Sequence, residues 1–248
     1  MARPRIAEFA LDLGTWRTRL INNSGEMIAD APTIVALPIG RRGSGAVAIG
    51  AAAQRMEGRV PIGLEVVRPV RNGAISSFSA TEVFLRALLR QSIGRSLRKP
   101  TIAVCVHQSL SAIERRALLE SVLAAGAREV HLLPSPVATA LGAGLAIPAP
   151  EGNIVANLGA GGVEVAITSL GGVANQRRSP HGGDLLEDGI HGWLRVERGV
   201  QIGSRTVRNL KHHVCAASPN IPRSSIRVRA RSIADGSPTE LDVSTHDL

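Results

Sequence analysis

The sequence predicts an α/β fold built from a duplicated unit, and three observations support this prediction. The chain of 248 residues is 44% hydrophobic and 20% charged, which is typical of a globular protein with a sizeable core. Short β-branched runs alternate with capped apolar segments that read as helices. The pattern that opens the chain also recurs 145 residues later. We therefore expect two related halves with a ligand-binding cleft between them.

The first half opens with three antiparallel strands. An apolar run from Ile6 to Leu13 predicts the first strand. The segments Thr18–Ile21 and Glu26–Ala29 flank a turn signal at residues 23–25, so they predict a hairpin.

Helices and further strands alternate after this hairpin. Ser79 and Glu82 form a capping box that opens a buried helix, and Ser111 and Glu114 form a second one. Gly94 and Gly126 are the expected ends of these two helices. The remaining elements of this half are strands at Thr101–Val106 and Glu129–Leu133, then a helix of small residues with Ser135 as N-cap, Pro136 at its first position and its end near Gly144.

The second half repeats the opening. The segment Ala10–Thr15 matches Val155–Ala160, and each is an apolar strand that runs into a turn containing glycine. A second strand at Glu164–Thr168 and a tight turn at Gly171 and Gly172 follow, as in the first copy. Pseudo-symmetry then predicts that the two glycine turns face each other across a cleft.

Three glycine-containing sites favour phosphate as the ligand. They are the turn at residues 12–15, the turn at residues 157–162, and the segment His181–Asp184 at the head of a helix. Backbone N–H groups in such turns can surround an anion, and a helix N-terminus favours negative charge. Each signal is weak alone, but three in this order, two of them related by the repeat, predict a phosphate site.

Composition excludes several classes of protein. The chain has no Tyr, three Phe and two Trp, which argues against recognition of single-stranded nucleic acid by stacking. Cys105 and Cys215 share no disulfide-framework or zinc spacing, so a reducing cytoplasm is expected, and Cys105 in its predicted strand reads as a buried small hydrophobe. No apolar run approaches the roughly 18 residues of a membrane span.

Basic residues are concentrated late in the chain. The net charge is +9, and eleven Lys or Arg face four acidic residues between Gln176 and Arg231, whereas residues 232–248 carry only acidic charges. A solvated basic face is the simplest interpretation. A surface for anionic lipid or nucleic acid remains an alternative.

The combined motifs resemble the actin-like ATPases, and specifically the bacterial MreB/Mbl cell-shape proteins. The resemblance extends from about Ile6 to Asp242. The segments that carry it are Asp12–Thr15, Ile49–Gly50, Arg55–Pro61, Arg68–Pro69, Asn72–Ile75, Glu114–Ala117, Ala125–Val130, Ala143–Leu145, Glu164–Ala166, Ser169–Gly172, Gly182–Asp184 and Ile202–Gly203.

The resemblance implies an actin-like (RNase H-like) duplicated α/β fold that binds ATP with Mg²⁺. Asp12 would face the metal through its water shell. The residues expected to contact the nucleotide are Asp12, Gly14, Thr15, Asn157, Gly159, Gly161, Gly162, Gly182, Gly183, Asp184 and Lys211. Trp16 occupies a turn where the family holds a small residue, so its ring would cover the nucleotide or fill its place.

Several residues depart from the family pattern. Asn157 replaces an Asp of the second phosphate loop, which removes a charge that a hard cation prefers and puts Mg²⁺ binding in doubt. Pro134–Pro136 replaces a Glu-Glu-Pro segment that orients the attacking water, and Ser135 without a partner base cannot substitute for it. Arg208 stands where the family has a Glu one turn from Lys211. We therefore expect no catalytic residue and a nucleotide affinity that is weak or lost.

We expect two domains. Residues 1–150 would form a complete first half with a small insert at about residues 32–75, and residues 151–248 an incomplete second half. A full second copy would extend about 47 residues beyond residue 248. The exposed strand edge of such a half favours a partner chain.

The resulting prediction is a cytoplasmic MreB/Mbl-type cytoskeletal protein. It would join filaments of itself or of a full-length MreB-like paralogue, serve the cell-wall synthesis machinery, and contact anionic membrane weakly through charge and through a loop carrying Leu97. No specific nucleic acid is expected. The alternative function is a weak ATP-binding ATPase whose cleft a partner chain completes, and a basic surface binder on the same scaffold is a third possibility.

Overall fold

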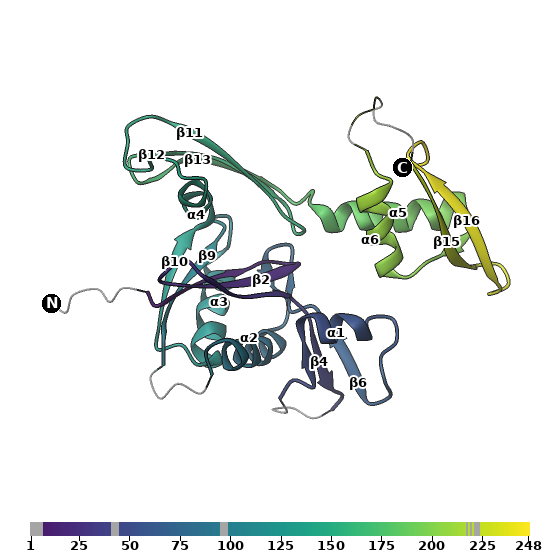
Figure 1. The fold of residues 1–248 in the computed structure, drawn as a ribbon, viewed down its shortest axis with the longest axis horizontal. Helices are drawn as coiled ribbons and strands as arrows, with labels where there is room; N and C mark the ends of the chain where they lie inside the picture. Colours follow the sequence, from purple (N-terminus) through teal and green to yellow (C-terminus); the bar gives the residue numbers. More distant parts are fainter. Residues whose placement is uncertain (1–6, 41–44, 95–98, 217, 219, 221–223) are drawn as a thin grey trace. The chain divides into compact units, whose positions relative to one another are not determined.

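A computed structural model describes residues 7–40, 45–94, 99–216, 218, 220 and 224–248. The chain forms two compact units, residues 1–182 and 183–248, and each is considered by itself (Figure 1). Leu97, expected in a membrane-contacting loop, lies outside the described residues. The predicted division into halves at residue 150 follows the repeat rather than these units and stays a prediction.

The first unit contains a mixed sheet in the order β10-β9-β1-β2-β3. Strands β9 and β10 run parallel to β1, while β2 and β3 continue antiparallel. The predicted strands are therefore confirmed, the first of them beginning at Phe9. The bounds are β1 Phe9–Leu13, β2 Arg17–Asn22, β3 Met27–Pro32, β9 Thr101–Val106 and β10 Glu129–Pro134.

Two helices, α2 (Phe78–Ile93) and α3 (Ala112–Ala125), pack on this sheet (Figure 1). The capping box at Ser111 is present, and Gly126 follows the end of α3 as predicted. The capping box predicted at Ser79 is wrong, because the N-cap of α2 is Ser77, whose extended backbone lets its Oγ accept a hydrogen bond from the N–H of Ala80. The core beneath the helices includes Leu11, Leu20, Phe84, Leu85, Ile102, Val104 and Val122.

Short elements lie between β3 and α2. They enclose a small apolar cluster of Ile34, Ala36 and Ala53. Strand β4 pairs with β5 and β6 on its two sides, and β7 pairs with β8. The bounds are β4 Val35–Pro38, β5 Ala48–Ile49, α1 Gly50–Met56, β6 Leu64–Val67, β7 Val70–Arg71 and β8 Ala74–Ile75.

The repeat is visible in the strand register. Strands β11 (Asn153–Leu158), β12 (Val163–Ser169) and β13 (Gly172–Ser179) form an antiparallel sheet. Every pair between β11 and β12 from Ile154 to Leu158 lies 145 residues after its counterpart between β1 and β2. The duplicated architecture predicted from the sequence is therefore present in the backbone pairing.

Helix α4 (Ser135–Gly142) covers one face of this second sheet. The cluster beneath it consists of Val137, Ala140, Ile147, Val155 and Ala166. The expectation that Ser135 caps the helix is wrong: Pro134 takes the N-cap position, and Ser135 is the first helical residue. The Ser135 hydroxyl instead donates a hydrogen bond to Glu164 of β12, and this pair belongs to the candidate site described below.

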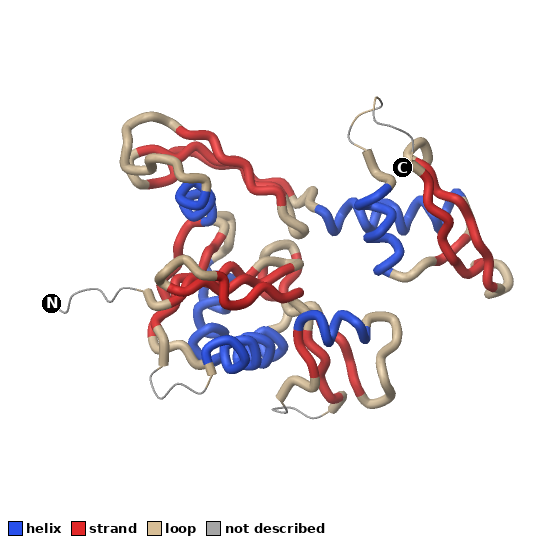
Figure 2. The backbone as a smooth tube through the Cα atoms, in the orientation of Figure 1, coloured by secondary structure: helices blue, strands red, loops and turns tan. Residues whose placement is uncertain are grey.

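The second unit packs two helices against a sheet, and Figure 2 shows its long hairpin of β15 and β16. The predicted helix head at His181–Asp184 is confirmed, since α5 begins at Gly183. The hairpin of β15 and β16 is not among the elements that the sequence predicts. The bounds are α5 Gly183–Glu197, β14 Val200–Gln201, α6 Ser204–His213, β15 Ser225–Ser232 and β16 Pro238–Ser244.

This hairpin explains part of the charge pattern. Arg227 on β15 pairs with Asp242 on β16 at 2.9 Å, and Arg229 pairs with Glu240 at 3.4 Å. The basic run and the acidic segment after it therefore neutralise each other locally. Exposed pairs of this kind contribute little to stability because solvent screens them. Among the described helices, none is long and apolar enough to cross a bilayer.

Candidate functional site

Three loops of the first unit meet where the sequence predicts phosphate binding. The N–H of Gly73, in the loop between β7 and β8, donates to Thr15 Oγ1 at 2.9 Å. A Cβ atom at Gly161 would collide with Thr15 Oγ1 and with the backbone of residues 72 and 73. A Cβ atom at Gly182 would likewise collide with Gly162 N. These glycines are required because the loops touch through their backbones.

Asp12 lies at the end of β1 beside Arg19 of β2. Arg19 Nη1 is 3.2 Å from Asp12 Oδ2, and Arg19 Nε is 3.8 Å from Asp30. Burial raises the pKa of Asp12, and the Arg19 charge opposes that rise. The carboxylate therefore already has a cationic partner within the protein.

These residues do not fit a carboxylate-held Mg²⁺. Asn157 supplies a neutral amide where a second carboxylate would stand, and Asp12 is paired with Arg19. No group of three or more His, Cys, Asp or Glu that could hold a metal occurs in the described part of the chain. Hard cations prefer several anionic oxygens, so the donor set supports phosphate better than it supports the metal.

Glu164 is a buried carboxylate that the sequence reading did not place in the site. It is 5% exposed and lies opposite Asn157 in the sheet. The hydroxyl of Ser135 donates to Glu164 Oε2, while Oε1 is buried with no hydrogen-bond partner in the described structure. The expectation that Ser135 has no partner base is therefore wrong, because the fold brings Glu164 to it from 29 residues away.

Arg178 on β13 joins two of the loops. Its Nη2 donates to the carbonyl oxygen of Asn72 at 2.7 Å and to that of Gly161 at 2.9 Å. His107 lies beside it, with Nε2 3.2 Å from Gly73 O. Burial, followed by the Arg178 charge, lowers the pKa of His107, so this ring is neutral at pH 7. The sequence alone places Arg178 among the basic residues between Gln176 and Arg231 and predicts no role for it in the site.

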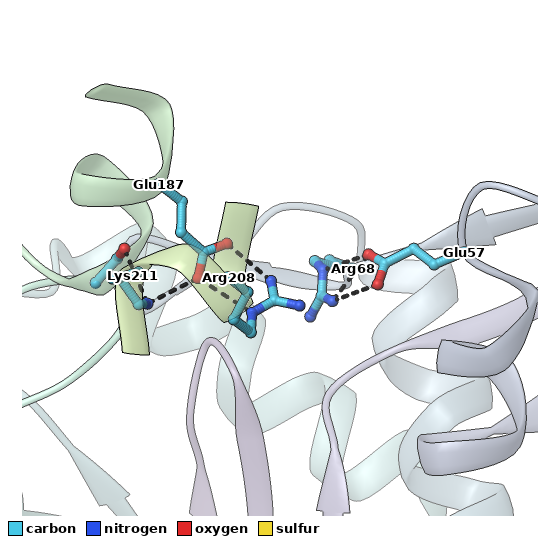
Figure 3. A network of polar contacts seen from close by, with 6 residues as sticks. Glu57, Arg68, Glu187, Arg208 and Lys211 are labelled. Atoms are coloured by element: carbon cyan, nitrogen blue, oxygen red, sulfur yellow. Dashed lines mark hydrogen bonds and ion pairs between the residues drawn. The ribbon is translucent and has the colours of Figure 1, made fainter. Parts of the chain in front are cut away.

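Trp16 stacks on a guanidinium group. The Cζ of Arg68 lies 4.1 Å from the centre of a Trp16 ring. Arg68 Nη2 also lies 2.8 Å from Glu57 Oε1 (Figure 3). Cation–π contacts of this kind are worth about 0.5–2 kcal/mol. The large ring in the first turn is therefore held by Arg68 of the neighbouring segment.

Lys211 contacts an acid in the second unit. Lys211 Nζ is 2.7 Å from Glu187 Oε1 and 3.2 Å from Gly183 O, and Arg208 Nη2 is 2.9 Å from Glu187 Oε2 (Figure 3). Side-chain exposures of 11–14% show that the cluster is nearly buried. Glu187 thus supplies a carboxylate that the family pattern places at position 208. The sequence pattern does not reveal this pairing, because α5 and α6 meet only in the fold.

Comparison with known proteins decides the family. The family described as "MreB/Mbl protein" matches residues 6–248. The chain belongs to the MreB/Mbl family. Cell shape-determining protein MreB of Escherichia coli K12 is 34% identical over 97% of this chain and 71% of its own length. Cell shape-determining protein Mbl of Bacillus subtilis 168 is 28% identical over 97% of this chain and 72% of its own length.

Solved structures confirm the actin-like fold expected for an MreB/Mbl protein. MreB5 of Spiroplasma citri bound to ADP matches with a TM-score of 0.86 at 24% identity, over 96% of this chain and 71% of that one. The MamK double helical filament matches with a TM-score of 0.72 at 16% identity, over 94% and 72%. That the loops of this chain hold phosphate stays a prediction.

Proposed function

We propose that this chain is a bacterial actin-like cytoskeletal protein that acts in cell-shape determination. The match of its whole described length to the MreB/Mbl family carries the proposal. A relative at 34% identity is named for cell-shape determination, and a structural neighbour is a double helical filament. The chain would associate with filaments of itself or of a full-length MreB-like paralogue.

Nucleotide binding is part of this proposal. The meeting of Thr15, Gly73 and Gly161 supports a phosphate-binding role, and neighbours of the same fold were crystallised with ADP and AMPPNP. Asn157 and the Pro134–Pro136 segment favour weak binding and slow turnover. The pairing of Ser135 with Glu164 is the one observation that favours the alternative, an ATPase completed by a partner chain.

The proposed function also implies where in the cell the protein would act. A filament-associated protein of this family would work in the cytoplasm at the inner face of the membrane, together with the wall-synthesis machinery. The net charge of +9 supports a weak electrostatic attraction to anionic lipid.

Co-sedimentation tests the association. The purified chain is mixed with polymerising full-length MreB of Escherichia coli and pelleted, with each protein alone as the control. We expect the chain to enter the pellet only when MreB polymerises. In cells, a fluorescent fusion should form a filament-like pattern that disperses when the complete paralogue is depleted. A chain that stays in the supernatant and is diffuse in cells in both states contradicts the proposal.

A further inference from the structure

The guanidinium of Arg178 lies among the backbone groups of the candidate phosphate loops. Both hydrogen bonds of its Nη2 go to carbonyl oxygens, those of Asn72 and Gly161. A Cβ atom at Gly73 or Gly162 would lie 2.9 or 3.0 Å from the same Nη2. Among the described residues, no carboxylate lies within ion-pair distance of this guanidinium. A full positive charge therefore stands in the loops, and its hydrogen bonds to Asn72 and Gly161 go to neutral carbonyl oxygens. Glu164 lies opposite Arg178 in the sheet, and hydrogen bonds from Ser111, with a smaller effect of the Arg178 charge, lower the pKa of Glu114. These two acids therefore lie near the guanidinium without forming an ion pair with it.

The repeat places Arg178 in a row of three polar residues. Asn157, Glu164 and Arg178 lie opposite one another on β11, β12 and β13. In the first sheet, the row Asp12, Arg19 and Asp30 lies opposite one another on β1, β2 and β3. The first row holds two acids and one base, and the second an amide, an acid and a base. Compared with the first row, the second has an amide in place of the acid at its first position and a base in place of the acid at its third position.

We propose that the loops around Gly73, Gly161 and Gly162 bind the phosphate groups of a nucleotide through Arg178, without a divalent cation. The inference rests on the nucleotide binding proposed above. Arg178 would supply the positive charge that Mg²⁺ brings to phosphates elsewhere. Its planar fork of donors suits phosphate oxygens.

Arg178 would gain by exchanging its carbonyl acceptors for phosphate oxygens. Hydrogen bonds from a guanidinium to anionic oxygen are shorter and stronger than bonds to neutral carbonyls. A phosphate that displaces Asn72 O and Gly161 O therefore gains the stronger bond. Arg178 Nη2 is hydrogen-bonded to the loops of Asn72 and Gly161, and Gly161 lies close against Thr15. A phosphate that enters must therefore break these hydrogen bonds and move the loops apart.

Binding measurements test the proposal without depending on hydrolysis. ATP, ADP, pyrophosphate and adenosine are titrated by calorimetry in EDTA and in excess Mg²⁺. For each of ATP and ADP, we expect the dissociation constant in EDTA to lie within about threefold of that in excess Mg²⁺, because no metal is needed. Pyrophosphate should compete with ATP, whereas adenosine should bind at least about tenfold more weakly than ADP, because the phosphates carry the contact.

Arg177 provides a matched control on the same strand. It is exposed on the opposite face of β13, opposite Val165, and donates to the carbonyl oxygen of its neighbour Gln176. Arg178→Gln should weaken ATP binding about ten- to a hundredfold, whereas Arg177→Gln should change it less than about twofold. Arg178→Lys keeps the charge without the fork and should fall between them, which keeps the test valid if the Gln variant unfolds.

The outcomes separate the possible failures. A Mg²⁺ requirement above about tenfold, equal affinity of Arg178→Gln and wild type, or no nucleotide binding in either buffer would overturn the inference. Binding of pyrophosphate without binding of ATP would show that the loops recognise free phosphate compounds. It would overturn the proposal that their ligand is a nucleotide. Failure of co-sedimentation with MreB, with Arg178-dependent ATP binding intact, would overturn the filament role alone.

Discussion

Ala156 lies directly opposite Val165 between β11 and β12, at the register that places Leu11 opposite Leu20 between β1 and β2. Leu11 and Leu20 are fully buried in the core that α2 and α3 complete. Ala156 and Val165 are exposed on the face of their sheet opposite α4. The exposed apolar face of the second sheet is thus the counterpart of the buried face of the first.

This face should promote association of the isolated chain. Ile154, 73% exposed, pairs across the strands with Ile167, 39% exposed. We expect the double variant Ile154→Thr/Ile167→Thr to lower the concentration dependence of sedimentation velocity and the binding of a hydrophobic dye, because contiguous apolar surface drives association. Ile113→Thr, at an isolated position 81% exposed on α3, is the control and should behave as wild type. Equal behaviour of both variants would show that the face does not self-associate.

Ser77 and Ser79 distinguish the observed cap from the predicted one. Ser77→Ala removes the acceptor for the N–H of Ala80 and should lower the free energy of unfolding by about 1 kcal/mol. Ser79→Ala should change it by less than about 0.5 kcal/mol, since Ser79 is an exposed helical residue and Ala favours a helix. Urea unfolding followed by circular dichroism measures both. The reverse order of effects would place the cap at Ser79.

Glu187 holds two cations in the second unit. Glu187→Ala leaves Arg208 and Lys211 nearly buried without this carboxylate, and should lower the free energy of unfolding by about 3 kcal/mol. Glu197→Ala, at an exposed position near the end of the same helix, should cost less than about 0.5 kcal/mol. Urea unfolding followed by tryptophan fluorescence in a Trp16→Phe background, where Trp193 is the fluorophore, reports on this unit. Equal losses in the two variants would mean that the cluster contributes nothing specific.

Cys105 should resist alkylation. Burial, with a smaller effect of the Asp12 charge, raises the pKa of the Cys105 thiol from 9.0 to about 11. Its thiolate fraction at neutral pH should therefore be about a hundredfold below that of an ordinary thiol. Labelling by iodoacetamide, followed by mass spectrometry, should be slow at pH 7 and should rise about tenfold per pH unit up to about pH 11. Denatured protein is the control and should label rapidly. Fast labelling of Cys105 in the native protein at pH 7 would contradict the burial.

Hydrolysis of ATP should be negligible in the isolated chain. The Pro134–Pro136 segment carries no acid, and a positioned general base typically contributes about 10²- to 10⁴-fold in rate. Phosphate release should not exceed that of Asp12→Ala, measured side by side. A clear rate in wild type that Glu164→Gln abolishes would instead favour the ATPase alternative through the Ser135–Glu164 pair.

The sequence by itself determined the elements whose signals are local. The strands of both copies follow from short apolar runs, and the repeat of 145 residues is retained in the strand register. The capping box of Ser111 and Glu114 spans only three residues, so its partners are found without knowledge of the fold. Family membership followed from motifs of the same short range.

Only the tertiary structure decided which side chains share a site. Ser135 meets Glu164, Arg178 meets Asn72, and Glu187 meets Lys211 over separations of 24 to 106 residues. Such pairs leave no periodic trace in a sequence, because their geometry depends on strand register and helix packing rather than on spacing along the chain. The position of Arg178 beside the loops of Asn72 and Gly161 therefore depends on the pairing of β13 with β12.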